Sequence, residues 1–443
     1  MNLKQRDKHS LWHPYTQHQT AIDPLPIISG SGAYLIDEQA RRYLDMTSSW
    51  WVNLHGHSHP IIAKAIYEQA LQLEHVLFAN FTHEPAIQLA EQLLALAPAN
   101  LKKVFYSDNG STAVEVALKM AYQYWSNRDE PQRKRVIAFT GGYHGDTFGA
   151  MAISKTCGFF TAFEPLLFSV ETFHYPATWL DDTEVLAKEA NCLAELTEYL
   201  QNHAHETAAI ILEPLVQGVN GMAMCREKFL QHLETIARRY GILIIYDEVM
   251  TGFARTGKLF ACLKAQTTPD ILCIAKGITG GFLPLAATLC SDEIYNTFLG
   301  NGFDRALAHG HSYTANPLGC AAGLASLKLL MTDNTQTQLQ TIAEVHSQQL
   351  QQLSNTCGAV IENLRQCGTI AAFDLKTKVA YASPVSQKLQ QNCQDVGLLI
   401  RPLGKTVYLL PPYCVTAEEL QWAYATLTQV LTKLPYPLNP TPK

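Results

Sequence analysis

The stretch DILCIAKGITGG, residues 270–281, joins an apolar run to a single lysine and a group of glycines. Residues 271–274 are typical of a strand buried within a sheet, and Lys276 comes just after that run. A lysine half withdrawn from water has a lowered pKa, which favours covalent chemistry with carbonyl compounds. Most lysines point into solvent, however, so both interpretations stay open for this stretch alone.

Short apolar runs alternate with helical patterns on both sides of this stretch, from residue 61 to residue 325. The alternation predicts an α/β fold, with a mostly parallel central sheet flanked by helices. Residues 111–125, for example, place apolar side chains at helical spacing between two of the runs. The strand-like runs are 102–107, 135–142, 208–215, 241–249, 270–277 and 285–291.

The two ends of the chain have a different pattern. Residues 326–443 alternate helices and short strands, and they end in a helix and a proline-rich tail. Residues 1–60 are rich in aromatic and turn residues, and this segment looks too short to fold alone. We therefore expect an N-terminal segment 1–60 that joins a smaller α+β domain, 326–443, beside a large domain, 61–325.

Composition limits the classes of protein that fit. The 443 residues carry a net charge of −6, which indicates no basic surface for nucleic acid. The 11 cysteines form no CxxC pair, a usage typical of reduced thiols in the cytoplasm. No run reaches the roughly 18 apolar residues of a membrane helix, and the N-terminus lacks the apolar core of a signal peptide. We expect a cytoplasmic protein that binds neither membranes nor nucleic acid.

Two polar features could act together with Lys276. Asp247 follows an apolar run, at the carboxyl end of a predicted strand, where α/β sheets bind their ligands. An aspartate buried there needs a cationic partner. Gly110 and Ser111 stand at the start of the helix 111–125, where free N–H groups and the helix dipole suit a phosphate. An ordinary capped helix start explains Gly110 and Ser111 equally well.

The stretch FTGGYHGDTFGAM, residues 139–151, adds an aromatic side chain, Tyr143, in a glycine-rich segment after a strand. The glycines permit either a close approach of the backbone to a flat ring or a simple turn. A phosphate pocket, a stacking aromatic, a deep aspartate and a strand-end lysine are together what pyridoxal phosphate requires. The combination therefore favours this cofactor.

The stretch HGHSHP, residues 55–60, places His55, His57 and His59 at alternate positions, as metal ligands on an extended segment would be. No cysteine or carboxylate lies close in sequence to complete such a site. We predict no metal ion.

Six motifs together resemble the class III aminotransferases, which are fold type I pyridoxal phosphate enzymes, and the resemblance covers nearly the whole chain. It implies that Lys276 binds the cofactor covalently and moves the substrate proton. It also implies that Asp247 keeps the pyridine nitrogen protonated and that Tyr143 stacks on the ring. The motifs are 107–119, 141–151, 210–214, 246–257, 269–281 and 309–323.

The same resemblance assigns the phosphate to Gly110 and Ser111. It implies a homodimer with shared active sites, in which Ser312 reaches the phosphate of the neighbouring subunit. Related enzymes often have threonine at position 312, and His311 stands where the best-known relatives have proline. Glu213 orients the residues around the site on this view.

Three stretches outside the cofactor site, 11–18, 46–57 and 399–413, resemble the branch of the family that works in biotin biosynthesis. That branch uses S-adenosyl-L-methionine as amino donor, or lysine in some relatives, and 8-amino-7-oxononanoate as acceptor. The resemblance implies a pocket walled by aromatic side chains, with a backbone N–H and an arginine for carboxylate groups. These residues are Tyr15, Trp50, Trp51, Gly310 and Arg401.

Several alternatives stay open. Trp50 and Trp51 fit core packing as well as a substrate wall, and Arg255 fits a structural ion pair as well as a substrate contact. Another class III aminotransferase, acting on an ω-amino acid, would not need the two tryptophans and Arg401 together. A non-catalytic protein on the same fold would have no use for Lys276 and Asp247.

Overall fold

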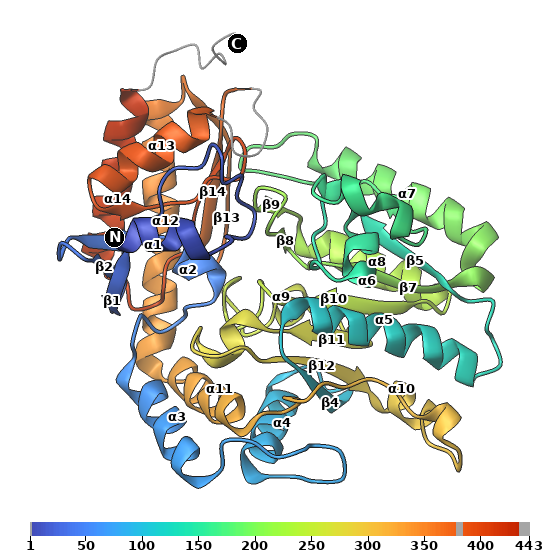
Figure 1. The fold of residues 1–443 in the computed structure, drawn as a ribbon. Helices are drawn as coiled ribbons and strands as arrows, with labels where there is room; N and C mark the ends of the chain where they lie inside the picture. Colours follow the sequence, from blue (N-terminus) through green and yellow to red (C-terminus); the bar gives the residue numbers. More distant parts are fainter. Residues whose placement is uncertain (1, 378–383, 434–443) are drawn as a thin grey trace.

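The computed structural model describes residues 2–377 and 384–433, and its centre is a seven-stranded sheet (Figure 1). The strand order is β4-β12-β11-β10-β7-β5-β6. Strand β12 runs antiparallel to β4 and β11, and the other pairs are parallel, which confirms the predicted α/β fold. The bounds are β4 Leu101–Ser107, β5 Arg135–Phe139, β6 Glu171–Phe173, β7 Thr207–Leu212, β10 Leu243–Asp247, β11 Ile271–Ile274 and β12 Ala286–Ser291.

Helices cover both faces of this sheet because its central strands are apolar on both sides. Ile245 and Cys273 pack with α5 on one face, whereas Ile244 and Leu272 pack on the other face with α4, α7 and α8. The helices of this part are α3 Pro60–Gln72, α4 Glu84–Leu96, α5 Gly110–Asn127, α6 Phe148–Ile153, α7 Val185–His203, α8 Glu227–Arg239, α9 Ala261–Ala265, α10 Asp292–Thr297 and α11 Pro317–Leu330.

A four-stranded sheet, β1-β2-β3-β15, unites the two ends of the chain, because β15 pairs in parallel with β3. A three-stranded antiparallel sheet, β13-β14-β16, lies in the C-terminal part. The N-terminal elements are α1 Leu3–Ser10, β1 Ile27–Ser31, β2 Tyr34–Asp37, β3 Arg42–Asp45 and α2 Ser48–Trp51. The C-terminal elements are α12 Asp333–Cys357, β13 Ile361–Cys367, β14 Ile370–Leu375, α13 Pro384–Asp395, β15 Leu398–Leu399, β16 Thr406–Leu409 and α14 Ala417–Thr432.

We keep the division into 1–60, 61–325 and 326–443 as a proposal, and the shared sheet supports the joining of the two ends. Helix α11 runs through residue 325. The proline-rich tail, 434–443, lies outside the described residues. Within the described ranges, no helix is long and apolar enough to cross a membrane.

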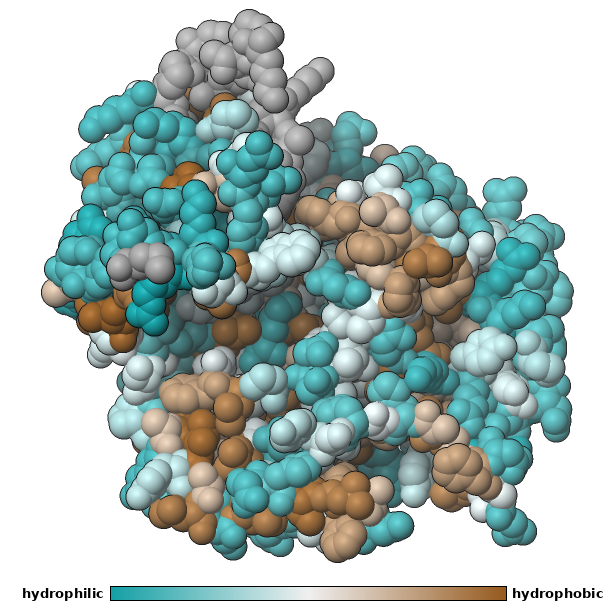
Figure 2. All heavy atoms as spheres, in the orientation of Figure 1, coloured by the Kyte–Doolittle hydropathy of each residue, from teal (hydrophilic) through white to brown (hydrophobic). Residues whose placement is uncertain are grey.

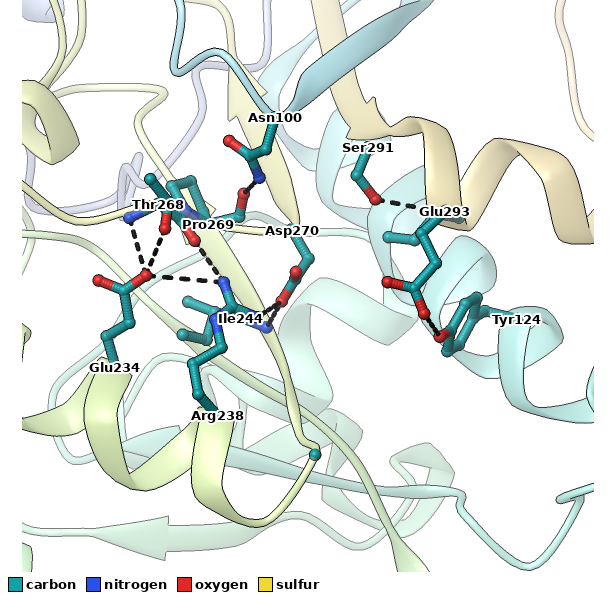
Figure 3. A network of polar contacts seen from close by, with 12 residues as sticks. Asn100, Tyr124, Glu234, Arg238, Ile244, Thr268, Pro269, Asp270, Ser291 and Glu293 are labelled. Carbon is teal, nitrogen blue, oxygen red and sulfur yellow. Dashed lines mark hydrogen bonds and ion pairs between the residues drawn. The ribbon is translucent and has the colours of Figure 1, made fainter.

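The amino end of β11 is fixed by a polar network (Figure 3). The Oδ2 atom of Asp270 accepts hydrogen bonds from the Ile244 N–H at 2.7 Å and from Arg238 at 2.6 Å. Arg238 also donates to the carbonyl of Thr268. These contacts hold the segment before β11 against the first residues of β10 and against α8, at the end of the strands that lies away from residues 275–281.

Candidate active site

A cavity of about 620 Å³ lies beyond the carboxyl ends of β7, β10 and β11, a size typical of ligand sites. Parallel sheets bind ligands at this edge. Nine of the residues assigned to the site from the sequence line the cavity, namely Tyr15, Trp50, Trp51, Gly110, Ser111, Tyr143, Glu213, Asp247 and Lys276.

Lys276 enters the cavity two residues after β11, where the chain turns into a short 3₁₀ helix, Lys276–Thr279. Its φ is +46°, so the backbone bends sharply as it leaves the strand. Burial lowers the pKa of the Lys276 ammonium, and the negative charges of Asp247 and Glu213 oppose that shift. The amine lies 4.9 Å from the centre of the Trp51 ring. A neutral amine is therefore accessible here at lower pH than in solution.

Asp247 ends β10 and is almost completely buried. Its Oδ2 atom lies 2.7 Å from Nδ1 of His144, and its Oδ1 atom accepts the Val249 N–H at 3.0 Å. Because the carboxylate can only accept, His144 donates through Nδ1, and its Nε2 atom is buried without a partner among the described residues. His144 lies beside Tyr143 within the motif 141–151, and this position is the one signal in the sequence that points to it.

Glu213 follows β7 and joins two backbone segments of the site. Its Oε1 atom accepts the Tyr143 N–H at 3.1 Å, and its Oε2 atom accepts the Gly218 N–H at 2.8 Å. Burial raises the pKa of the Glu213 carboxyl to about 7, and the nearby charge of Asp247 also raises it. His144 and the two backbone hydrogen bonds act in the opposite direction.

Tyr143 and Tyr15 share one carboxylate. Both hydroxyls donate to Oδ1 of Asp146, at 3.0 Å from Tyr143 and 2.5 Å from Tyr15. Burial is the main reason why the pKa of both hydroxyls is raised. The Asp146 N–H in turn donates to the Ser111 hydroxyl at 3.1 Å. The tyrosine pair is thus tied to the start of α5.

Helix α5 presents its N-terminus to the cavity. Asn109 caps it, because its side chain accepts the Thr112 N–H at 3.1 Å. A side chain at Gly110 would approach Val249 to 2.7 Å, so only glycine fits against that residue. The first-turn N–H groups of a helix have no partner within the helix, and they suit an anion.

Another part of the cavity wall is a left-handed turn, α2, whose four residues all have positive φ. Left-handed geometry costs roughly 1–2 kcal/mol per residue for L-amino acids, so other contacts must hold this turn. Trp51 is buried and donates its ring N–H to the Tyr408 hydroxyl at 3.0 Å. Trp50 remains 39% exposed, and its ring lies 3.9 Å from the Arg401 guanidinium. Both tryptophans line the cavity.

Three predicted residues lie elsewhere. Among the described residues, the cavity lining does not include Gly310, Ser312 or Arg401. The Arg401 guanidinium lies 3.9 Å from the centre of the Trp50 ring, which does line the cavity. Gly310 and Ser312 belong to the loop that precedes α11.

Arg255 is fully buried and has a structural environment. Its guanidinium donates to the carbonyls of Pro411 at 2.8 Å and Asn53 at 2.9 Å, so it connects the N-terminal and C-terminal segments. Among the described residues Arg255 forms no ion pair, and it is not part of the cavity lining.

The three histidines of residues 55–60 do not converge on one point. His55 bonds the Ser326 hydroxyl at 3.1 Å, whereas His57 bonds Asp45 at 3.1 Å. Within the described ranges, no group of three or more histidine, cysteine or acidic side chains is placed to hold a metal ion.

The cavity fits pyridoxal phosphate on several counts. Lys276 is a strand-end amine with a lowered pKa, which suits an aldehyde. The buried carboxylate of Asp247 suits a protonated ring nitrogen, and the open start of α5 suits a phosphate. The sheet and this site define a fold type I pyridoxal phosphate enzyme.

Comparison with known families narrows the class. The family model described as aminotransferase class-III matches residues 15–431. The chain belongs to the class III aminotransferase family, and it is a pyridoxal-phosphate-dependent transaminase.

Individual relatives agree with this assignment. The adenosylmethionine-8-amino-7-oxononanoate aminotransferase of Synechococcus elongatus is 50% identical over 425 residues, which cover 96% of this chain and 99% of that protein. The crystal structure of the enzyme with the same name from Methanocaldococcus jannaschii has a TM-score of 0.90 and 36% identity, covering 97% of this chain and 98% of that one. A pyridoxal-phosphate-bound amine transaminase from an uncultivated Pseudomonas species has a TM-score of 0.89 and 31% identity, covering 96% and 98%.

Proposed function

We propose that this enzyme transfers the amino group of S-adenosyl-L-methionine to 8-amino-7-oxononanoate, giving 7,8-diaminononanoate for biotin synthesis. The observation that carries the proposal is the Arg401–Trp50 stack at 3.9 Å, which holds a cation beside an aromatic ring that lines the cavity. A cation held there suits the distant carboxylate of a long apolar keto acid. The name and the 50% identity of the Synechococcus elongatus relative support this substrate pair.

Lys276 is proposed to perform the covalent and proton-transfer chemistry. When bound, pyridoxal phosphate supplies an aldehyde that reacts with amines and a ring that accepts electrons. The lowered pKa of Lys276 makes its neutral amine available to bond the aldehyde carbon. The neutral Lys276 amine would also accept the substrate proton and return it.

Asp247 is proposed to hold the proton on the ring nitrogen. The Val249 N–H and His144 fix its two oxygens, so the carboxylate meets the ring in one orientation. Tyr143 is proposed to stack on the ring, and its backbone is held by Glu213. Gly110 and Ser111 are proposed to bind the phosphate at the start of α5.

Tyr15, Trp50 and Trp51 are proposed to wall the substrate side. Aromatic faces attract the cationic sulfonium of the donor, and they stack on its adenine. Arg401 is proposed to form a bidentate pair with the acceptor carboxylate, and the Gly310 N–H to bind a carboxylate at the same side.

The enzyme is proposed to act as a cytoplasmic homodimer, in which Ser312 and Gly310 complete the active site of the other subunit. Exposed apolar side chains support a dimer surface around α3 and the loop before α11. The Tyr313 ring lies 5.1 Å from His75, so this loop and the segment after α3 share one surface. Figure 2 shows hydrophobic residues gathered on the lower part of the molecule, in the region of α3, α4 and α11. The exposed residues include Ile61, Tyr67, Leu71, Leu77, Phe81 and Tyr313.

Dilution tests the proposed dimer. If Ser312 binds the phosphate across the interface, dilution to monomers should release the cofactor, and added pyridoxal phosphate should favour the dimer by mass action. Sedimentation with absorbance detection of the cofactor measures both. A monomer that retains full cofactor affinity would contradict the shared site.

A donor competition tests the substrate pair. The cofactor-loaded enzyme is given 8-amino-7-oxononanoate with S-adenosyl-L-methionine, lysine or an ω-amino acid, and the diamine formed in the first turnover is measured by mass spectrometry. We expect S-adenosyl-L-methionine to give the fastest diamine formation. A faster reaction with lysine would reassign the donor. If none of the donors leads to amination of this keto acid, the result would favour an ω-amino acid transaminase.

A further inference from the structure

The turn that carries both tryptophans has an unusual backbone. Ser48, Ser49, Trp50 and Trp51 have φ values of +48°, +46°, +68° and +73°, and none of them is glycine. In this geometry the Cβ atom crowds the following carbonyl, so the segment would not keep the conformation by itself. The surrounding protein must therefore hold the turn in place.

Asp45, at the end of β3, binds the turn through its side-chain carboxylate. Its side chain is 1% exposed. The Oδ1 atom accepts the Thr47 N–H and hydroxyl, both at 2.9 Å. The Oδ2 atom accepts the Ser49 N–H at 2.7 Å, the Ser49 hydroxyl at 3.1 Å and Nε2–H of His57 at 3.1 Å. One carboxylate thus receives five hydrogen bonds, four of them from the residues that begin the turn.

His57 fixes the carboxylate in turn. Its Nδ1 atom accepts the Asn53 side-chain N–H at 3.1 Å, which leaves Nε2 as the donor toward Asp45. The ring packs on Gly30, where an added Cβ atom would meet the His57 Cβ at 2.7 Å. A second anchor is the Ser48 hydroxyl, which donates to the Leu410 carbonyl at 2.7 Å.

The turn directs its two indoles to different parts of the cavity. Trp51 faces the Lys276 amine at 4.9 Å and is fixed by Tyr408. Trp50 lies against Arg401 at 3.9 Å and meets the Tyr15 ring edge-on at 6.0 Å. Successive side chains of a helical turn diverge by about 100°, so the left-handed turn itself sets this division.

We propose that Asp45, supported by His57, is a positioning residue that fixes the Ser48–Trp51 turn and thereby sets the affinity for the keto acid. Asp45 contacts neither the cavity nor the reacting atoms, and it acts through Trp50 and Trp51. The inference rests on the substrate-side role proposed above for these two tryptophans.

The test compares Asp45→Asn with Asp37→Asn. Asp37 is an equally buried carboxylate on the neighbouring strand β2, and it accepts hydrogen bonds from Tyr43 at 2.9 Å and Arg41 at 2.8 Å, away from the cavity. In Asp45→Asn one acceptor oxygen is replaced by an NH₂ group, which then faces hydrogen-bond donors that the carboxylate had bound. We expect KM for 8-amino-7-oxononanoate to rise by about tenfold with a smaller change in kcat, since small displacements of positioning groups have such effects. Asp37→Asn should leave KM near the wild-type value.

A second readout needs neither cofactor nor substrate. This readout is the near-ultraviolet circular dichroism of the cofactor-free protein, and Trp50→Phe identifies the part of the spectrum that comes from Trp50. The spectrum should change in Asp45→Asn and not in Asp37→Asn. If Asp45→Asn fails to fold, Ser49→Ala and Thr47→Val, which remove single hydroxyl donors, should show the same changes at reduced size.

The two readouts separate the inference from the proposed function. An unchanged tryptophan signal in folded Asp45→Asn, or an equal rise of KM in Asp37→Asn, would overturn the positioning role and leave the proposed reaction untouched. A changed signal with an unchanged KM would overturn the link to substrate affinity, and with it the proposed role of the two tryptophans.

Discussion

The two sides of the cavity are built in different ways. On the side proposed for the cofactor, Lys276, Asp247 and Glu213 stand at the carboxyl ends of three adjacent parallel strands, β11, β10 and β7. On the side proposed for the substrate, a strained turn at residues 48–51 meets a segment around Arg401, more than 300 residues away in the chain. Sheet register fixes the first side, whereas side-chain hydrogen bonds and ring contacts fix the second. Changes in substrate preference are therefore easier to accommodate on the second side.

The largest effect is expected from Lys276→Ala, which removes the reacting amine on the sheet side. Turnover should fall by roughly 10³-fold or more, as for other covalent groups that act directly on substrate. The variant should still retain pyridoxal phosphate through dialysis, because the phosphate pocket at α5 is intact. After borohydride reduction, mass spectrometry should find the cofactor attached to the wild type and not to the variant. Normal turnover would refute the assignment of Lys276.

A smaller loss is expected from Asp247→Asn, which keeps the shape of the side chain and removes its charge. The rate should fall on the order of 100-fold, with little change in substrate affinity, because the charge is needed most when electrons flow into the ring. Rapid-mixing measurements of the donor reaction provide the test.

Asp270→Asn is the matched control for Asp247→Asn. Asp270 stands at the amino end of β11 and bonds Arg238 and the Ile244 N–H, far from the cavity lining. This variant should lose stability and keep its rate. An unchanged rate in Asp247→Asn would mean that the ring nitrogen has another partner.

The contrast between the two sides also explains what the sequence could predict. Runs such as 241–249 and 270–277 indicate buried parallel strands, and such strands end at one edge of a sheet, so Asp247 and Lys276 were predicted to be neighbours. The helix start at 110–111 and the glycine-rich stretch 139–151 indicated Gly110, Ser111 and Tyr143, and the class III resemblance implied their roles. All three line the same cavity. Their roles stay predictions until the variants are measured.

Tertiary contacts decide the rest. The turn at 48–51 contains no glycine to announce positive φ, so no local signal reveals it. The His144–Asp247 bond joins residues 103 positions apart, although a histidine beside Tyr143 in a glycine-rich stretch was a usable hint. The sequence leaves an ion pair and a substrate contact open for Arg255, and its bonds to backbone carbonyls depend on segments that only the folded chain brings together.

The substrate side is tested by Arg401→Ala, which should leave the donor reaction nearly intact and impair the acceptor reaction. Loss of a charge-assisted bidentate pair should lower the apparent affinity for the keto acid by roughly 30-fold. Arg401→Lys should recover only part of this, because an ammonium cannot bond both oxygens in a planar pair. The deaminated donor product and the diamine are quantified separately. An equal loss in both reactions would show that Arg401 serves the fold or both substrates.

The effect expected at Glu213, the residue that connects the two sides, is a pH-dependent change in stability. One of its oxygens holds the Tyr143 backbone on the sheet side, and the other holds Gly218, where an added Cβ atom would meet the Trp51 ring at 3.0 Å. Because burial raises the pKa of Glu213 to about 7, the folded protein binds a proton that the unfolded chain releases near pH 4.5. The bound proton therefore stabilises the folded state fully below about pH 4.5. This stabilisation is lost as the pH rises through about 7.

Glu213→Gln removes this titration and keeps one acceptor oxygen. The free energy of unfolding of the cofactor-free wild type, minus that of the variant, should therefore fall with rising pH across this window. The slope should be at most about 1.4 kcal/mol per pH unit, the limit for one proton. Urea unfolding of both proteins from pH 5 to pH 8 measures it. A difference that stays constant with pH would mean that Glu213 is ionised throughout. The buried carboxylate would then depend on the positive charge of Lys276. In that case charge, and not only hydrogen bonds, couples the two sides of the cavity.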